Sequence, residues 1–170
     1  AARDERLQSG RFATVEPTAA TPPREDRVDL RVSALSRASE RILRAADAWP
    51  ALVDHGCPYS DMVVWDAASR SDAWDALHCT AAETGEADLG HIVENVRVQW
   101  ALLESRHLRS VTHIRAGLEA LAFDDEAARV TLSDGRRLAC SLVVGADGGQ
   151  SRTRELCGIG RGGWTYGQTA

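Results

Sequence analysis

The stretch Val143–Arg154 constrains the fold more than any other part of the chain. Its apolar start, together with Leu142, predicts a strand buried in a sheet, because a cluster of glycines follows directly. Gly145, Gly148 and Gly149 allow backbone amides to approach a ligand where a side chain would block it. The predicted helix after them offers free N–H groups. This order of strand, glycine turn and helix predicts a nucleotide-cofactor site.

Asp147 and Arg154 are the candidate ligand-binding side chains of this stretch. A carboxylate beside a pyrophosphate would be repelled, so we expect Asp147 to accept hydrogen bonds from cofactor hydroxyls while Arg154 supplies positive charge. A purely structural interpretation also exists. Asp-Gly is a common turn dipeptide, and Ser151 is a common helix N-cap.

Hydrophobic periodicity predicts strands and helices along the rest of the chain. A helix is expected from Ser33 to Trp49, where Pro50 ends it, and another after Asn95. Strands are expected at 12–16, 62–66 and 73–79, and then as an antiparallel meander at 111–115, 118–123, 129–133 and 138–144. The predicted fold class is therefore α/β.

Composition excludes several functional classes. The 170 residues carry a net charge of −5, which argues against a nucleic-acid-binding protein. The sequence has no apolar run close to the ~20 residues of a membrane span. The 4 cysteines are widely spaced and are expected to be reduced, in a cytoplasmic setting. The histidines, among them His91, have no metal-ligand spacing, so His91 is expected to be a hydrogen-bonded structural residue.

The string Gly-Ala-Asp-Gly-x-x-Ser-x-x-Arg over 145–154 resembles the Asp-Gly motif of flavoprotein aromatic hydroxylases of the para-hydroxybenzoate hydroxylase type. More narrowly, it is similar to the ubiquinone-biosynthesis hydroxylases. Further segments support this resemblance in their order along the chain: Asp29–Leu35 with Ala38-Ser39, Tyr59 with Val64–Asp66, Gly90–Asn95, and Gly158-Ile159 with Trp164 and Tyr166.

The resemblance implies a set of cofactor contacts and no catalytic or metal-ligating side chain. Arg31 and Gln99 would touch the middle of FAD, and Asp147, Gly148 and Arg154 would secure the ribose and pyrophosphate region. Arg31 also has an interpretation as a surface cation, and Gln99 as a cap for a neighbouring loop. By analogy, Glu16 would hold the adenosine ribose, since an acidic residue ends the second strand of a dinucleotide fold.

The implied architecture is a partial FAD-binding dinucleotide (Rossmann-like) fold with an antiparallel β-meander and part of a substrate-side sheet. Segments 1–60 and 92–160 are expected in the FAD-binding domain, and 61–91 and 161–170 in the substrate domain. The Gly-x-Gly-x-x-Gly fingerprint is missing before residue 1. We therefore expect a middle piece of a longer protein, and weak or no FAD binding by these residues alone.

The expected activity of the full-length protein is that of an FAD- and NAD(P)H-dependent monooxygenase. It would hydroxylate the aromatic ring of a polyprenylated phenol in ubiquinone biosynthesis, within a biosynthetic complex or in peripheral contact with the inner membrane. Two alternatives are a flavin monooxygenase of another small aromatic substrate and a truncated non-catalytic homologue that acts by binding.

Overall fold

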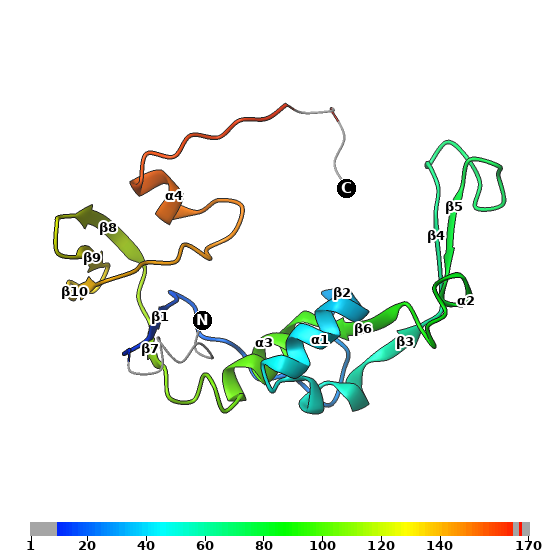
Figure 1. Cartoon of the computed structure of the whole chain (residues 1–170), viewed down its shortest axis with the longest axis horizontal. Coiled ribbons are helices and arrows are strands. Elements are labelled where there is room, and N and C mark those ends of the chain that lie inside the picture. Colours follow the sequence, from blue (N-terminus) through cyan, green and yellow to red (C-terminus); the bar gives the residue numbers. More distant parts are fainter. Residues whose placement is uncertain (1–9, 165–166, 168–170) are drawn as a thin grey trace. The chain divides into compact units, whose positions relative to one another are not determined.

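The computed structural model describes residues 10–164 and 167. It contains helices, antiparallel sheets and one parallel strand pair, which confirms the predicted α/β class (Figure 1). The chain divides into two compact units. One comprises Ala20–Val111 with the residues up to Phe12, and the other comprises Ala13–Ala19 with the residues from Thr112 onward.

The first unit combines short strands with helices. Its elements are β2 (Val32–Ser36), α1 (Arg37–Ala45), the 3-10 turns η2 (Trp49–Ala51) and η3 (Val53–His55), β3 (Cys57–Tyr59), β4 (Asp61–Val64), β5 (Leu77–Thr80), α2 (Ala81–Thr84), β6 (Gly90–Glu94) and α3 (Asn95–Glu104). β6 lies between β2 and β3 and is antiparallel to both.

The helix predicted from Ser33 begins four residues later than expected. Residues 32–36 form a ladder with β6 instead, because strand pairing overrides the helical pattern of the apolar residues. Ser36 then caps α1, with its hydroxyl accepting a hydrogen bond from the Ser39 amide at 3.3 Å. Ile42 on this helix is 69% exposed.

The core of the first unit lies between α1, η2, β6 and α3. Its buried members are Leu43, Ala48, Trp49, Leu52, Val93 and Ala101. Trp49 packs edge-on against the His91 ring, with the ring centroids 5.1 Å apart. This core fixes the junction between β6 and α3.

β4 and β5 pair antiparallel in a separate two-stranded sheet, so both strands predicted for this region are confirmed (Figure 1). Their bounds are shorter than predicted. Trp65 and Trp74 are 48% and 97% exposed. A lone two-stranded ribbon has no second layer to bury them.

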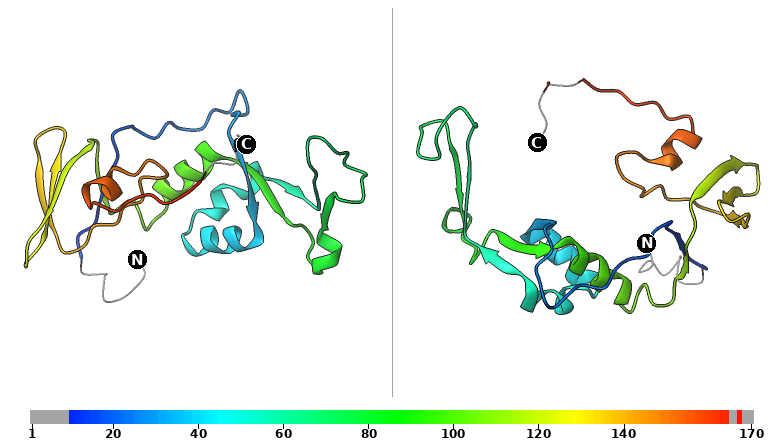
Figure 2. Two further views of the ribbon diagram at one scale, coloured as in Figure 1. Left: turned by 90° about the horizontal axis from the view of Figure 1, so that it is seen from above. Right: turned by 180° about the vertical axis from the view of Figure 1, so that it is seen from behind.

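The second unit holds the predicted meander. Its elements are β1 (Ala13–Val15), β7 (Thr112–Ile114), β8 (Leu118–Phe123), β9 (Ala128–Leu132), β10 (Arg137–Cys140) and α4 (Arg152–Leu156). β8, β9 and β10 are antiparallel neighbours, which Figure 2 shows from two directions. Gly135, at φ 86°, makes the turn between β9 and β10. β7, expected as the first strand of the antiparallel meander, instead pairs in parallel with β1 in a separate sheet.

The prediction of a buried strand at Leu142–Val144 is wrong. β10 ends at Cys140, and residues 141–149 form no strand. Leu142 and Val144 are 72% and 73% exposed, whereas Val143 packs on the core around Ile114 and Leu132. An apolar run becomes a buried strand only where neighbouring strands pair with it, and none of the described strands does so here.

Replacing Gly90 with alanine is expected to prevent β6 from pairing with β2. A Cβ at Gly90 would lie 1.9 Å from the Leu35 carbonyl oxygen, and this backbone atom cannot move without opening the ladder. We expect Gly90→Ala to cost more than about 3 kcal/mol of unfolding free energy in the complete protein, measured by urea denaturation. Gly162→Ala, with no atom within 4 Å of the new methyl group, should be close to neutral. Equal stability of both variants would contradict the packing described for Gly90.

Candidate functional site

Asp147 organises the loop that precedes α4. Its Oδ1 accepts a hydrogen bond from the Ser151 hydroxyl, and its Oδ2 accepts from the amide and hydroxyl of Thr153 at 2.8 and 3.0 Å. These bonds to the charged form hold the pKa of Asp147 well below its usual range, with the Ser151 hydroxyl as the largest cause. The carboxylate therefore stays ionised and closes the loop onto the helix.

The amides at the start of α4 are largely engaged within the chain. Ser151 is buried and caps the helix by accepting a hydrogen bond from the Arg154 amide at 3.0 Å. The Thr153 amide is bound to Asp147. The free helix N-terminus expected for a phosphate is therefore not what the structure presents, because side chains satisfy the first amides and α4 has 5 residues.

The Gly148-Gly149 backbone remains open to a ligand. A Cβ added at either glycine would meet no atom within 4 Å, and Gly148 has φ 79°, which favours glycine. Arg154 donates to the Gly149 carbonyl at 3.1 Å. A guanidinium has further N–H groups, so Arg154 retains donors for a ligand beside this loop.

Gly145 serves packing and not ligand approach. A Cβ at this position would lie 2.9 Å from the Thr153 methyl group, so the loop lies close against α4 at this point. The three glycines predicted to act alike therefore divide into one packing glycine and two open ones.

Glu16 directly follows β1 and is exposed. Its amide donates to the Ile114 carbonyl at 3.0 Å, which continues the parallel ladder between β1 and β7. Glu16 thus lies at the carboxyl end of a parallel strand. In open α/β sheets, ligands bind outside these ends.

Arg31 lies in the first unit, immediately before β2. Its amide donates to the Asp29 carboxylate at 2.8 Å, and its carbonyl accepts from the Asn95 amide at 2.9 Å. The residue is exposed, and its guanidinium makes no hydrogen bond or ion pair within the described part of the chain. A cation with a fixed backbone and an uncommitted head group can bind an anionic ligand.

Gln99 is exposed on α3, one turn after Asn95. Asn95 donates its backbone amide to the Arg31 carbonyl, so α3 begins beside Arg31. Arg31 and Gln99 both belong to the first unit, while Glu16, Asp147, Gly148 and Arg154 belong to the second unit.

Sequence reasoning missed a pair of buried charged residues in the first unit. Glu94 and Arg97, at the junction of β6 and α3, are buried and joined by a charged hydrogen bond of 2.5 Å. An acidic and a basic residue three positions apart at the start of a helix is the signal that would have found them.

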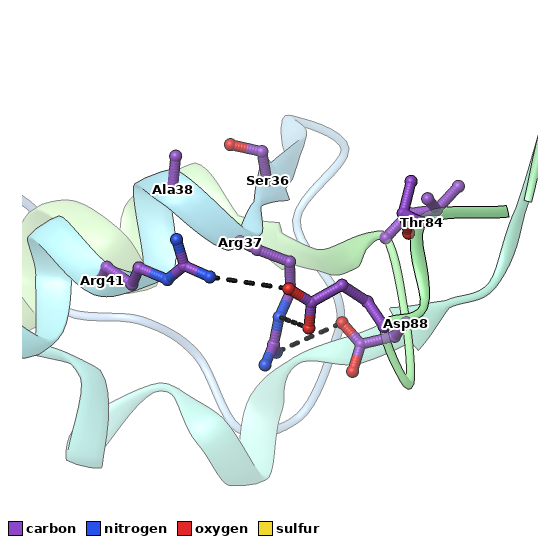
Figure 3. Close-up of a pocket in the computed structure, with 8 residues that line it drawn as sticks. Ser36, Arg37, Ala38, Arg41, Thr84 and Asp88 are labelled. Atoms are coloured by element: carbon purple, nitrogen blue, oxygen red, sulfur yellow. Dashed lines mark hydrogen bonds and ion pairs between the residues drawn. The ribbon is translucent and has the colours of Figure 1, made fainter. Parts of the chain in front are cut away.

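A hollow of about 300 Å³ lies beside α1, and matched charges line it (Figure 3). Arg37 pairs with Asp88 at 3.3 Å and with Glu86 at 3.8 Å, and Arg41 pairs with Glu86 at 3.6 Å. Glu86 and Asp88 thus join the acidic segment at 83–88 to α1. Because the charges neutralise one another, this hollow favours neither an anion nor a cation.

His91 differs from its predicted role. It was expected to be a hydrogen-bonded structural histidine, but its buried Nδ1 has no hydrogen-bond partner among the described residues. The nearest acceptors, on Glu40 and Asp88, are each 3.9 Å away. Packing against Trp49 holds the ring here. No three His, Cys, Asp or Glu side chains of the described ranges gather as a metal site requires.

A model of the FAD binding domain family matches residues 24–166, so the chain belongs to this family of FAD-binding domains. Its most similar relatives include ubiquinone-pathway enzymes. The 3-demethoxyubiquinol 3-hydroxylase of Escherichia coli (strain K12) is 33% identical over 147 residues, covering 83% of this chain and 36% of the relative. Ubiquinone hydroxylase UbiL of Rhodospirillum rubrum is 37% identical over 144 residues, covering 84% and 32%. The chain thus spans about a third of the length of these relatives.

Solved structures show the same fold. A PqsL variant of P. aeruginosa superposes with a TM-score of 0.65 at 22% identity, covering 94% of this chain and 42% of that one. The Diels-Alderase PyrE3 has a TM-score of 0.65 at 18% identity, covering 89% and 30%. These likenesses confirm the predicted FAD-binding fold.

The residues present fit the flavin dinucleotide of the family. The first unit offers Arg31, whose guanidinium N–H groups are unused among the described residues. The second unit offers Arg154, an open glycine backbone and the exposed Glu16 carboxylate at a strand end. Phosphates bind to arginine and backbone N–H groups, and ribose hydroxyls bind to carboxylates.

Asp147→Asn is expected to destabilise the second unit at pH 7, because the amide cannot accept all three hydrogen bonds. The folded-state pKa is lowered, so the stabilisation is complete above the unfolded pKa of about 3.9 and is lost as pH falls through the folded value. Urea unfolding of the complete protein at pH 7 and pH 3 should show a smaller difference between variant and wild type at pH 3. Asp125→Asn, in an exposed turn, is the control. A difference independent of pH would contradict the role given to the carboxylate.

Proposed function

We propose that this chain is part of an FAD-dependent monooxygenase that hydroxylates the aromatic ring of a polyprenylated phenol in ubiquinone biosynthesis, with NAD(P)H as reductant. The family match over residues 24–166 supports the flavin cofactor. The relatives support the pathway, since they include a 3-demethoxyubiquinol 3-hydroxylase and a ubiquinone biosynthesis monooxygenase, COQ6, of Rattus norvegicus, which is 30% identical over 152 residues.

The cofactor assignment is carried by the hydrogen bonding of Arg31. Its backbone is bonded at both the amide and the carbonyl, while its exposed guanidinium has no partner in the described part of the chain. Surface arginines that serve stability are commonly paired in this chain, as Arg129 is with Asp124 at 2.7 Å. An arginine held in place but unpaired is suited to a phosphate.

Each proposed contact has a definite task. Arg31 and Arg154 would neutralise the pyrophosphate, and Gln99 would hydrogen-bond the chain between the phosphates and the flavin ring. Glu16 would accept hydrogen bonds from the adenosine ribose. Asp147, with both oxygens engaged, would shape the Gly148 loop and accept from a ribose hydroxyl with its remaining lone pair.

When bound, FAD supplies the oxygen-transfer chemistry: NAD(P)H, a proton, O₂ and the phenol give NAD(P)⁺, water and the hydroxylated ring. Because the cofactor supplies this chemistry, the proposed residues need not include a nucleophile. These residues bind the cofactor, orient it and exclude water.

The remaining assignments are proposals from the sequence. We assign segments 1–60 and 92–160 to the FAD-binding domain and 61–91 and 161–170 to the substrate domain. A membrane-peripheral location and a biosynthetic complex would suit a substrate with a prenyl tail. None of the described helices combines the length and apolar character needed to cross a membrane.

The complete protein is expected to incorporate one atom of ¹⁸O₂ into a polyprenylated phenol in the presence of FAD and NADPH or NADH, detected by mass spectrometry. Labelling of a small soluble phenol alone would indicate a monooxygenase with another substrate. NAD(P)H oxidation and labelling that are absent with every phenol, despite bound FAD, would favour a non-catalytic binding protein.

Arg31→Gln and Arg154→Gln are each expected to weaken FAD binding by the complete protein about tenfold, because each removes a charge-assisted hydrogen bond to phosphate. Titration of the apoprotein with FAD, followed by quenching of flavin fluorescence, measures the dissociation constant. Arg129→Gln, which breaks an exposed ion pair in the second unit, should leave the dissociation constant unchanged. Equal affinity of all three variants would remove both arginines from the site.

A further inference from the structure

Glu94 is a buried carboxylate at the end of β6, with 7% of its surface exposed. Its Oε1 accepts a hydrogen bond from the Asp29 amide at 2.6 Å, and its Oε2 accepts from Arg97 Nε at 2.5 Å. The Asp29 amide is the largest cause that lowers the pKa of Glu94, followed by Arg97. Glu94 thus joins the segment before β2 to the first turn of α3.

Arg97 extends this connection. It is 8% exposed, and its Nη1 donates to the Glu25 carboxylate at 3.0 Å while its Nη2 donates to the Arg24 carbonyl at 3.1 Å. One guanidinium therefore binds Glu94 on one side and the 24–25 backbone and side chain on the other.

The bonds continue from Glu94 to Arg31 through Asp29. Glu94 fixes the Asp29 amide, and the Asp29 carboxylate accepts from the Arg31 amide at 2.8 Å. Asn95, the residue after Glu94, donates its amide to the Arg31 carbonyl and accepts from the Ser33 hydroxyl at 2.6 Å. Both described hydrogen bonds of the Arg31 backbone therefore connect it to the β6–α3 junction, one directly through Asn95 and the other through Asp29.

Apolar packing does not hold this segment. Val28 is 74% exposed and Leu30 is 99% exposed, so burial of side chains contributes little to its position. Polar bonds to Glu94, Asn95 and Arg97 fix it instead. A buried ion pair is costly to desolvate and adds little net stability compared with an apolar pair, but its geometry selects one arrangement of the chain.

We propose that Glu94 is a positioning residue for FAD, which acts through Asp29 by holding the Arg31 guanidinium at the cofactor pyrophosphate. Arg97 supports it by fixing the Glu94 carboxylate and the 24–25 segment. This inference rests on the proposed function, because it needs Arg31 to contact FAD. It adds two buried residues to the site that make no contact with the cofactor themselves.

A double-mutant cycle on the complete protein tests this role. Glu94→Gln keeps the size of the side chain but leaves one acceptor oxygen, without charge, for two donors, the Asp29 amide and Arg97 Nε, so the connection from Arg97 through Glu94 to the Asp29 backbone is broken at one of its two bonds. We expect Glu94→Gln to raise the dissociation constant for FAD about tenfold, as Arg31→Gln does, and the double variant to bind no more weakly than Arg31→Gln alone.

Glu40→Gln is the matched control for stability. Glu40 is a buried carboxylate of the same unit, 5% exposed and paired with Arg37 at 2.6 Å and with Arg44 at 2.8 Å. Its loss should lower the melting temperature as the loss of Glu94 does but should leave FAD affinity unchanged. If Glu94→Gln does not fold, Arg97→Lys replaces it in the cycle, since a single ammonium cannot hold Glu94 and Glu25 together.

The outcomes separate the two claims. Wild type without FAD affinity would overturn the proposed function and this inference together. Arg31→Gln with wild-type affinity would remove Arg31 from the site and overturn this inference, while the proposed function would stand. An effect of Arg31→Gln without one of Glu94→Gln would overturn this inference alone, as would additive losses in the double variant. Loss of affinity in Glu40→Gln equal to that in Glu94→Gln would also overturn it, because instability would then explain both.

Discussion

The buried carboxylate of Glu94 is the interaction on which the first unit of this protein depends. It lies where the central strand β6 passes into α3, and both of its oxygens are committed, one to the backbone before β2 and one to Arg97. An uncompensated charge at this depth would be strongly destabilising, so the polar segment 24–31 must fold back onto the junction. Arg31 belongs to that segment. The position of the segment is therefore determined by the charge and hydrogen bonds of Glu94 and not by burial of apolar side chains.

Sequence patterns predicted the elements whose determinants are local. The turn at Gly135, the strand pairs β4–β5 and β8–β9–β10 and the helix after Asn95 all follow from alternation, turn residues and helical spacing. The predictions were wrong where residues distant in the sequence determine the local structure. Residues 32–36 form a strand because β6 pairs with them, and Leu142 and Val144 stay exposed because no described strand pairs with this stretch. The hydrogen bonds that engage Asp147 and the burial of Glu94 depend on tertiary contacts that no spacing rule reveals.

Five of the six predicted cofactor residues fall into two groups with different physical character, and the sixth, Glu16, is exposed directly after β1. Arg31 and Gln99 are exposed, without described side-chain partners, and both belong to the first unit. Asp147, Gly148 and Arg154 belong to a loop whose carboxylate is already used to close it, leaving the glycine backbone and part of the guanidinium for a ligand. Both groups suit a dinucleotide, which presents phosphates to arginines and hydroxyls to carboxylates and backbone. A protein of the FAD-binding family can thus leave the redox chemistry to its cofactor and devote its side chains to position.

A crystal structure of the complete protein with FAD would test this account most directly. We predict that the Arg31 guanidinium and the loop from Gly148 to Arg154 lie within hydrogen-bonding distance of the cofactor, with the Glu94–Arg97 pair intact behind Arg31. Density for FAD that touches neither Arg31 nor this loop would contradict the central claim that these residues hold the cofactor.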